Sequence, residues 1–170
     1  MRLLTICLAM LCFTSLAHAG DAPFEAPVPA VIGTWKLVSF FTEDSQTKQR
    51  NNAYGEHPTG ALSLTPAGRF LGIVTGENRK TGTIEEQAAA FRGMISYTGK
   101  WRLEGETFIT KVDASWDPHY VGTDQVRFWR VQDGKLYITS APVPNPNLAG
   151  PYYFDQVNAK AVGAYAKRCG

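Results

Sequence analysis

The strongest pattern in this sequence is an alternation of apolar and polar side chains with a period of two. It is clearest over residues 95–103, where alternate positions would share one face: Ile95, Tyr97, Gly99, Trp101 and Leu103. Since successive side chains of a β-strand point to opposite faces, this stretch is predicted to be a strand with one buried and one solvent-facing side. Glu104-Gly105 predicts a turn, after which two more strands are expected through residues 108–112 and 125–129.

Similar apolar stretches predict five further strands. They span residues 32–42, 61–65, 69–75, 135–140 and 152–157. In the first of these, the alternation places Trp35, Leu37 and Phe41 on one face and Val38 and Phe40 on the other.

Turn-forming residues separate these stretches. Pro66-Ala67-Gly68 predicts a tight hairpin, because proline presets the first turn angle and glycine accepts a positive φ. Asp133-Gly134 is a second strong hairpin signal. The prolines at 142, 144 and 146 exclude a central strand there and predict a stiff loop.

One internal helix is predicted where the period changes. Thr83-Ile84-Glu85-Glu86 fits a capping box, and Ile84, Ala88 and Phe91 then keep a helical spacing until Gly93. A second short helix is expected over residues 159–167, at the C-terminus. Eight short strands, mostly joined by hairpins, indicate an all-β fold, either a barrel or a sandwich. We expect a closed antiparallel barrel, because eight strands close around one small ligand and leave no exposed strand edge.

The first nineteen residues have the features of a signal peptide. Met1-Arg2 supplies a positive start, residues 3–16 are mostly apolar, and Ala17-His18-Ala19 fits a signal-peptidase site. The apolar run is shorter than the roughly 20 residues that a membrane span needs. We expect an exported protein, periplasmic or secreted, with no transmembrane segment. A leader at 20–30, rich in proline, would be followed by one domain over residues 31–170.

Charge and cysteine content narrow the possible partners. Of 17 Lys and Arg against 15 Asp and Glu, only Arg2 would leave with the signal peptide, so the mature net charge is expected to be +1. This near-neutral balance argues against nucleic acid as a partner. Only Cys169 would remain, which permits no internal disulfide and leaves either a free thiol or a link between two chains. We expect a monomer or a weak dimer.

Several segments resemble the bacterial and fungal lipocalin-like domain family. They are Gly33-Thr34-Trp35-Lys36-Leu37-Val38-Ser39, Gly60 with residues 64–69 (LTPAGR), residues 85–97 with Gly99, and residues 122–127 (GTDQVR). The resemblance covers most of the mature chain in the expected order. It implies an eight-stranded up-and-down barrel with a cavity for a small molecule, and it implies no particular reaction. The chain lacks the disulfide of secreted animal lipocalins, so their ligands do not transfer to it.

The sequence contains little that would predict a metal site or a cofactor site. The mature chain would keep only His57 and His119, which are far apart in sequence, so no pair has the spacing of metal ligands. No serine lies in a strand-turn-helix elbow, and no cofactor motif is present. We therefore expect neither a metal nor a cofactor.

Arg127 is the main candidate for ligand binding. It lies between Gln125 and Trp129 on one face of a predicted strand. Facing inward, it would be a buried cation that binds a carboxylate or carbonyl oxygen, with Trp129 as a stacking surface. Facing outward, it would be an ordinary arginine packed over an aromatic ring. The opposite face, with Val126 and Phe128, is the more apolar one, which favours the outward orientation. The family resemblance favours the inward one, so both orientations stay open.

Further candidates lie around the same sheet. Asp113, which shares a face with Ile109 and Lys111, would pair with Arg127 or act as a base if it faced inward, and would be a surface charge if not. Trp116 and His119 lie in a loop expected to roof the barrel mouth, and Tyr97 is expected to be cavity wall or core.

Three functions fit these predictions. The first is a binding protein for a small apolar or amphipathic molecule, using Arg127, Gln125, Asp113 and Tyr97, with Trp116 and His119 at the mouth. The second is an isomerase or cyclase acting by proton transfer, with Asp113 or His119 as base and no cofactor. The third is a structural barrel filled by its own side chains.

Overall fold

A computed structural model describes residues 29–142 and 152–161 of the chain, with Tyr152 described by its backbone only. The elements follow in this order: β1 (Gly33–Asp44), β2 (Arg50–Asn51), β3 (Thr59–Leu64), β4 (Arg69–Thr75), α1 (Ile84–Arg92), β5 (Met94–Glu104), β6 (Thr107–Ser115), the 3-10 helix η1 (Pro118–Tyr120), β7 (Asp124–Gln132), β8 (Lys135–Ser140) and β9 (Tyr152–Lys160).

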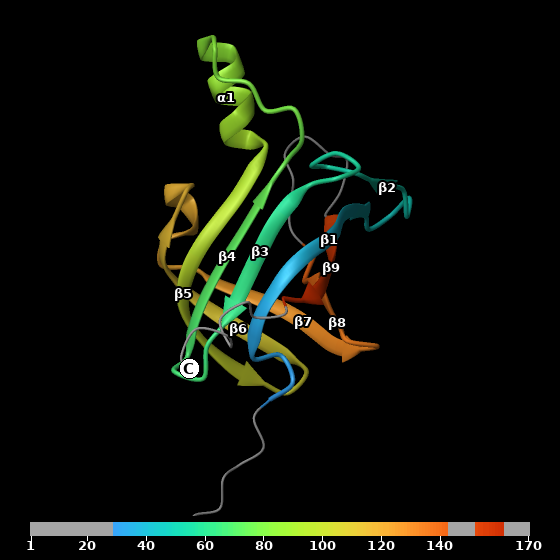
Figure 1. Ribbon diagram of the computed structural model, residues 1–170, viewed down its shortest axis with the longest axis vertical. Coiled ribbons are helices and arrows are strands. Elements are labelled where there is room, and N and C mark those ends of the chain that lie inside the picture. Colours follow the sequence, from blue (N-terminus) through green and yellow to red (C-terminus); the bar gives the residue numbers. More distant parts are fainter. Residues whose placement is uncertain (1–28, 143–151, 162–170) are drawn as a thin grey trace, which may run out of the picture.

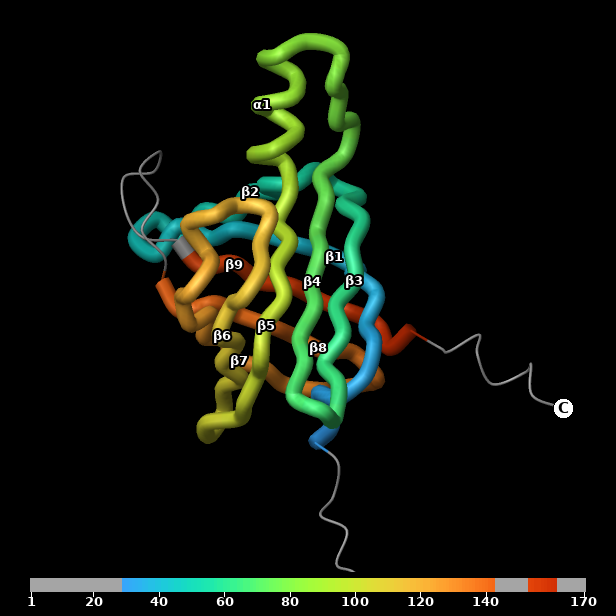
Figure 2. The backbone as a smooth tube through the Cα atoms, turned by 90° about the vertical axis from the view of Figure 1, so that its left-hand side faces the viewer, coloured from blue at the N-terminus to red at the C-terminus, as the bar shows by residue number. Residues whose placement is uncertain are grey.

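Within the described residues, eight strands form a closed antiparallel barrel. Their order is β1-β3-β4-β5-β6-β7-β8-β9, and β9 pairs back onto β1 from Trp35↔Lys160 to Asp44↔Tyr152. The two-residue strand β2 adds to β1 at the barrel rim. Figures 1 and 2 show the strands wrapped around one interior, with α1 projecting beyond one end. The predicted all-β, eight-stranded barrel with one internal helix is confirmed.

The local signals in the sequence produce the turns and the helix that they predicted. Gly68 has a φ of 77°, and its N–H donates to the Thr65 carbonyl at 3.0 Å. Asp133 and Gly134 both have positive φ, at 50° and 69°, as a two-residue hairpin turn requires. Thr83 and Glu86 form both halves of the capping box. Each of these contacts joins residues that are close in sequence, so it forms without help from the rest of the fold.

The predicted faces of β1 are wrong beyond Val38. Trp35 and Leu37 are buried as expected, but Phe40 is the next buried residue and Phe41 is not. The pairing with β9 shifts between Leu37↔Asn158 and Ser39↔Val157, so β1 carries one extra residue there. This β-bulge reverses the in-out order of every later side chain in the strand. The bulge therefore turns the Phe40 ring into the barrel.

The barrel interior has a closed end and an open end. At the closed end, a core surrounds Trp35, whose indole N–H donates to the Val31 carbonyl at 2.9 Å. The other buried members of this core include Leu62, Leu64, Phe70, Phe108 and Leu136. A smaller cluster of Leu37, Phe40, Val74 and Phe154 lies toward the end from which α1 projects. In β5, Tyr97 and Gly99 are buried as predicted, whereas Leu103 at the strand end is exposed.

Some expectations fall on residues that the structure does not describe. The signal peptide at 1–19, most of the leader at 20–30, the prolines at 144 and 146, and Cys169 lie outside the described residues. The C-terminal helix expected at 159–167 also lies mostly outside them. Its first two residues, Ala159 and Lys160, belong to β9 instead. Among the described helices, none is long and apolar enough to cross a membrane.

Candidate ligand-binding site

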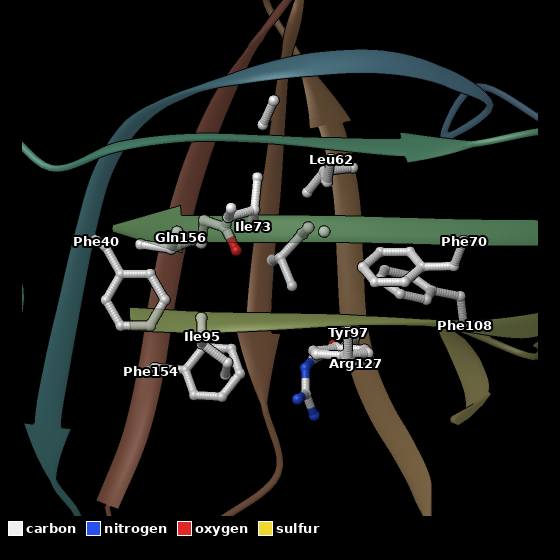
Figure 3. A pocket seen from close by; sticks show the side chains of 14 residues that line it. Phe40, Leu62, Phe70, Ile73, Ile95, Tyr97, Phe108, Arg127, Phe154 and Gln156 are labelled. Atoms are coloured by element: carbon white, nitrogen blue, oxygen red, sulfur yellow. The ribbon is translucent and has the colours of Figure 1, made fainter. Parts of the chain in front are cut away.

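A small cavity lies in the middle of the barrel; we call it the inner cavity. Its volume open to water-sized molecules is about 30 Å³. Aromatic rings from five strands form much of its wall, namely Phe40, Phe70, Tyr97, Phe108 and Phe154. Among the described residues that line it, only Arg127 and Gln156 carry a charge or an amide in their side chains. Figure 3 shows the guanidinium of Arg127 beside these rings. The inner cavity is therefore apolar with one cation.

Arg127 faces into the barrel and is 5% exposed. In the register of β6 and β7 it lies opposite Phe108, which is a core residue. Its guanidinium donates to the Val126 carbonyl and to the Gln125 side-chain oxygen, both at 2.8 Å, and lies 4.6 Å from the centre of the Phe154 ring. No acidic side chain in the described part of the chain pairs with it. Arg127 is thus a buried cation held by neutral partners.

Gln125 positions this cation. Its side-chain oxygen accepts from Arg127 while its amide group donates to the Thr123 hydroxyl at 2.8 Å. These two bonds fix which end of the amide faces Arg127. Gln125 itself does not line the inner cavity, so it acts through Arg127.

A larger basin opens at the mouth of the barrel; we call it the mouth basin. Its volume open to water-sized molecules is about 660 Å³. Six aromatic side chains line it: Phe40, Tyr54, Phe91, Trp116, Tyr120 and Phe154. A volume between about 300 and 1,000 Å³ is typical of pockets for small molecules. The mouth basin is thus large enough to hold one.

Three residues separate the mouth basin from the inner cavity. Phe40, Ile95 and Phe154 line both spaces. The rings of Phe40 and Phe154 stack with their centres 5.3 Å apart, and Tyr54 meets Phe40 edge-on at 4.8 Å. A group that passes from the basin to Arg127 must move past these rings.

The structure places Tyr97 and Trp116 where the sequence analysis expected them. Tyr97 lines the inner cavity, and its ring stacks on Phe70 at 5.0 Å. Trp116 lines the mouth basin, and its indole N–H donates to the Phe91 carbonyl at 3.2 Å.

His119 lies in the mouth loop but points away from both spaces. Its side chain is 93% exposed, and Nδ1 lies 2.8 Å from an Asp117 carboxylate oxygen. The backbone N–H of His119 donates to the same carboxylate and, together with the imidazole, holds the pKa of Asp117 below its ordinary value. In this arrangement His119 is no base for a molecule in the cavity.

The assignment of Asp113 to the cavity is wrong. Phe108, Thr110 and Val112 are the buried residues of β6 that face inward, so Asp113 lies on the outer face with Lys111. Its carboxylate accepts from Arg69, with the Nη2–Oδ1 distance at 2.8 Å, and this bond lowers the pKa of Asp113. Asp113 therefore neither pairs with Arg127 nor serves as a base inside the barrel.

Trp129 does not provide the stacking surface expected for Arg127. It faces inward, but it packs against the core at the closed end and does not line the inner cavity. The ring under the guanidinium is that of Phe154, which the sequence analysis missed. The sequence offered no usable signal for it, because Phe154 shares its strand face with the polar Gln156 and Asn158, whose burial only the structure shows. Phe40 was missed because the β1 bulge reverses its face.

Metal ligands do not gather in the described part of the chain. No group of three His, Cys, Asp or Glu side chains there is placed to hold a metal ion.

Comparison with known proteins agrees with this geometry. The model of a family described as a lipocalin-like domain matches residues 32–150. No curated protein matches the chain. The match covers well over half of the sequence and spans β1 to β8 of the closed eight-stranded barrel. The chain belongs to the lipocalin-like domain family.

Proposed function

We propose that this protein is an exported binding protein that holds one small amphipathic molecule, with a carboxylate or carbonyl group of that molecule at Arg127. The lipocalin-like barrel is a fold that suggests ligand binding. The observation that supports the specific proposal is the buried, inward-facing Arg127, which has no acidic partner among the described residues.

A buried charge needs compensation. Removing a cation from water costs several kcal/mol unless an anion or several hydrogen bonds replace the lost water. Arg127 has five N–H donors, of which two have acceptors among the described residues. A carboxylate or carbonyl oxygen in the inner cavity would accept from the others and form short, charge-assisted hydrogen bonds. The apolar walls would hold the rest of the molecule.

Native mass spectrometry of the protein purified from its own compartment tests this proposal. We expect an added mass that disappears on denaturation and is absent from the Arg127→Met variant. Arg130→Gln is the matched control, because Arg130 lies on the outer face of the same strand and stacks on Tyr137 at 4.2 Å. The proposal would be overturned if the native mass equalled that of the polypeptide alone and the protein bound no member of a panel of apolar and amphipathic acids.

Export rests on residues 1–19, which have a positive start, an apolar stretch and a small-residue cleavage site. Intact-mass measurement of the protein from a cell fractionation tests it. We expect a chain that begins near Gly20 in the exported fraction. An uncleaved chain in the cytoplasmic fraction would contradict export. The binding proposal does not depend on this result.

A further inference from the structure

The two spaces in the barrel differ greatly in volume. The inner cavity offers about 30 Å³ and the mouth basin about 660 Å³ to water-sized molecules. A single water needs about 10–15 Å³ by this measure, so the inner cavity has room for two or three atoms of that size. This suits the two oxygens of a carboxylate. The body of any ligand whose acid group reaches Arg127 must therefore remain in the mouth basin.

The closed end leaves no path for a long chain. Trp35, Leu64 and Leu136 are all at most 1% exposed, and they fill the barrel beyond the inner cavity. Protein interiors are packed as densely as organic crystals, so an alkyl chain could enter only by displacing this core. The ligand is thus limited to what the mouth basin holds.

The aromatic rings of the mouth basin form two walls. One wall consists of Phe91, Trp116 and Tyr120, with Trp116 and Tyr120 centred 4.9 Å apart. The other consists of Tyr54, Phe40 and Phe154.

These walls come from opposite sides of the barrel. Trp116 and Tyr120 follow β6, whereas Phe40 and Phe154 lie on β1 and β9. Since the eight barrel strands close in a ring, the pair β5–β6 lies across from the pair β1–β9; Figure 2 shows these pairs on the near and far sides of the tube. Aromatic rings prefer offset stacks and edge contacts with other rings, so two such walls favour a flat aromatic body between them.

We infer that the ligand class is a compact aromatic acid, bound with its carboxylate on Arg127 and its ring between the two aromatic walls. This inference rests on the proposed function and adds the shape of the ligand and its direction of binding. It excludes long-chain fatty acids as the preferred ligands.

Titration calorimetry with three probes tests the inference. The probes are 2-naphthoate, the uncharged 2-naphthamide and palmitate, each added to delipidated protein. We expect 2-naphthoate to bind at least about thirtyfold more tightly than 2-naphthamide, because the amide carbonyl accepts a hydrogen bond but brings no negative charge to the buried cation. Palmitate should bind more weakly than 2-naphthoate.

Two variants locate the bound probe. Arg127→Met should weaken the binding of 2-naphthoate by about thirtyfold or more and that of 2-naphthamide much less, because the uncharged amide loses only a hydrogen bond. Trp116→Leu should weaken both naphthalene probes by about threefold to tenfold, since it removes ring contacts at one wall. Arg130→Gln, outside the barrel, should change neither. Near-ultraviolet circular dichroism confirms that each variant is folded.

The outcomes separate this inference from the proposed function. Tighter binding of palmitate than of 2-naphthoate, with loss of both in Arg127→Met, would overturn the compact aromatic ligand and leave the binding function standing. Unchanged 2-naphthoate affinity in folded Arg127→Met would overturn the role of Arg127 in both. Binding of none of the three probes, in protein shown to be empty by native mass, would overturn both proposals together.

Discussion

At the closed end of the barrel, Trp35 is 1% exposed, and its indole N–H donates to the Val31 carbonyl. At the mouth, Trp116 makes the same kind of bond to the Phe91 carbonyl, but it lines an open basin, and the Phe91 ring beside it is 46% exposed. Both ends satisfy the polar atom of a tryptophan with a backbone carbonyl. At the closed end the ring fills the core, and at the mouth it leaves a surface that a ligand could cover.

This contrast separates stability from binding within one barrel. The closed end buries its rings against aliphatic side chains, which stabilises the fold. The mouth leaves apolar surface open, and the inner cavity behind it holds a cation that pairs with no acid among the described residues; neither contributes much to stability. Arg127 and the aromatic walls are therefore more consistent with a role in binding than with one in folding.

The largest expected effect is on stability, when an aromatic ring is removed from the closed end and, for comparison, from the mouth. Trp35→Ala should lower the free energy of unfolding by about 3–5 kcal/mol, because it leaves a cavity in a packed core. Phe91→Ala at the mouth should cost much less, about 1 kcal/mol or below, because Phe91 is 46% exposed and leaves no enclosed cavity. Urea denaturation of both variants measures this difference. Equal losses would remove the distinction between the two ends.

The next prediction concerns the buried cation. Arg127→Met should leave the free energy of unfolding of the empty protein unchanged or raise it by about 1 kcal/mol, since an apolar side chain of similar size avoids the cost of burying a charge. The same urea denaturation, on protein freed of ligand, measures it. If the free energy of unfolding fell by more than about 2 kcal/mol, Arg127 would be a residue that stabilises the barrel. That result would argue against its role in ligand binding.

A smaller and more local effect is expected in α1, which projects from the mouth (Figure 1). Thr83→Ala removes the capping box and should destabilise the helix by about 1 kcal/mol. Because α1 contacts the barrel at few points, the loss should appear as local opening. Hydrogen exchange in residues 86–92 should become about fivefold faster, while the barrel strands keep their protection. A matching loss in β5 and β6 would show that α1 unfolds with the barrel.

The smallest expected effect concerns the ion pair of Arg69 and Asp113 on the outer face of the barrel. Arg69 lowers the pKa of the exposed Asp113, so their bond adds stability that is complete above the ordinary carboxyl pKa of about 3.9. It is lost as the pH falls through the lower pKa of the folded state. Asp113→Asn should therefore slightly lower the urea midpoint at pH 7 and cause no difference at the most acidic pH at which the barrel stays folded. The affinity for ligand should not change. A lower affinity in Asp113→Asn would show that Asp113 contributes to ligand binding.

The candidate site could be predicted from the sequence only in part. For Asp113 the necessary signal was present, because it shares a face with Lys111 and not with Phe108, Thr110 and Val112. For Arg127 the signal was ambiguous, because both faces of β7 mix polar and apolar residues. The register with β6 decides it, since cross-strand neighbours share a face and Arg127 lies opposite the inward Phe108.

The sequence alone determined the strands, the hairpin turns and the capped helix, because each depends on alternation or on contacts within a few residues. Tertiary structure decided which face of β7 is inside, where the β1 bulge lies, and which end stays open. These features depend on pairings such as Trp35↔Lys160 and on the ring that eight strands close together. A pattern of period two defines two faces of a strand, but only its neighbours decide which of them is buried.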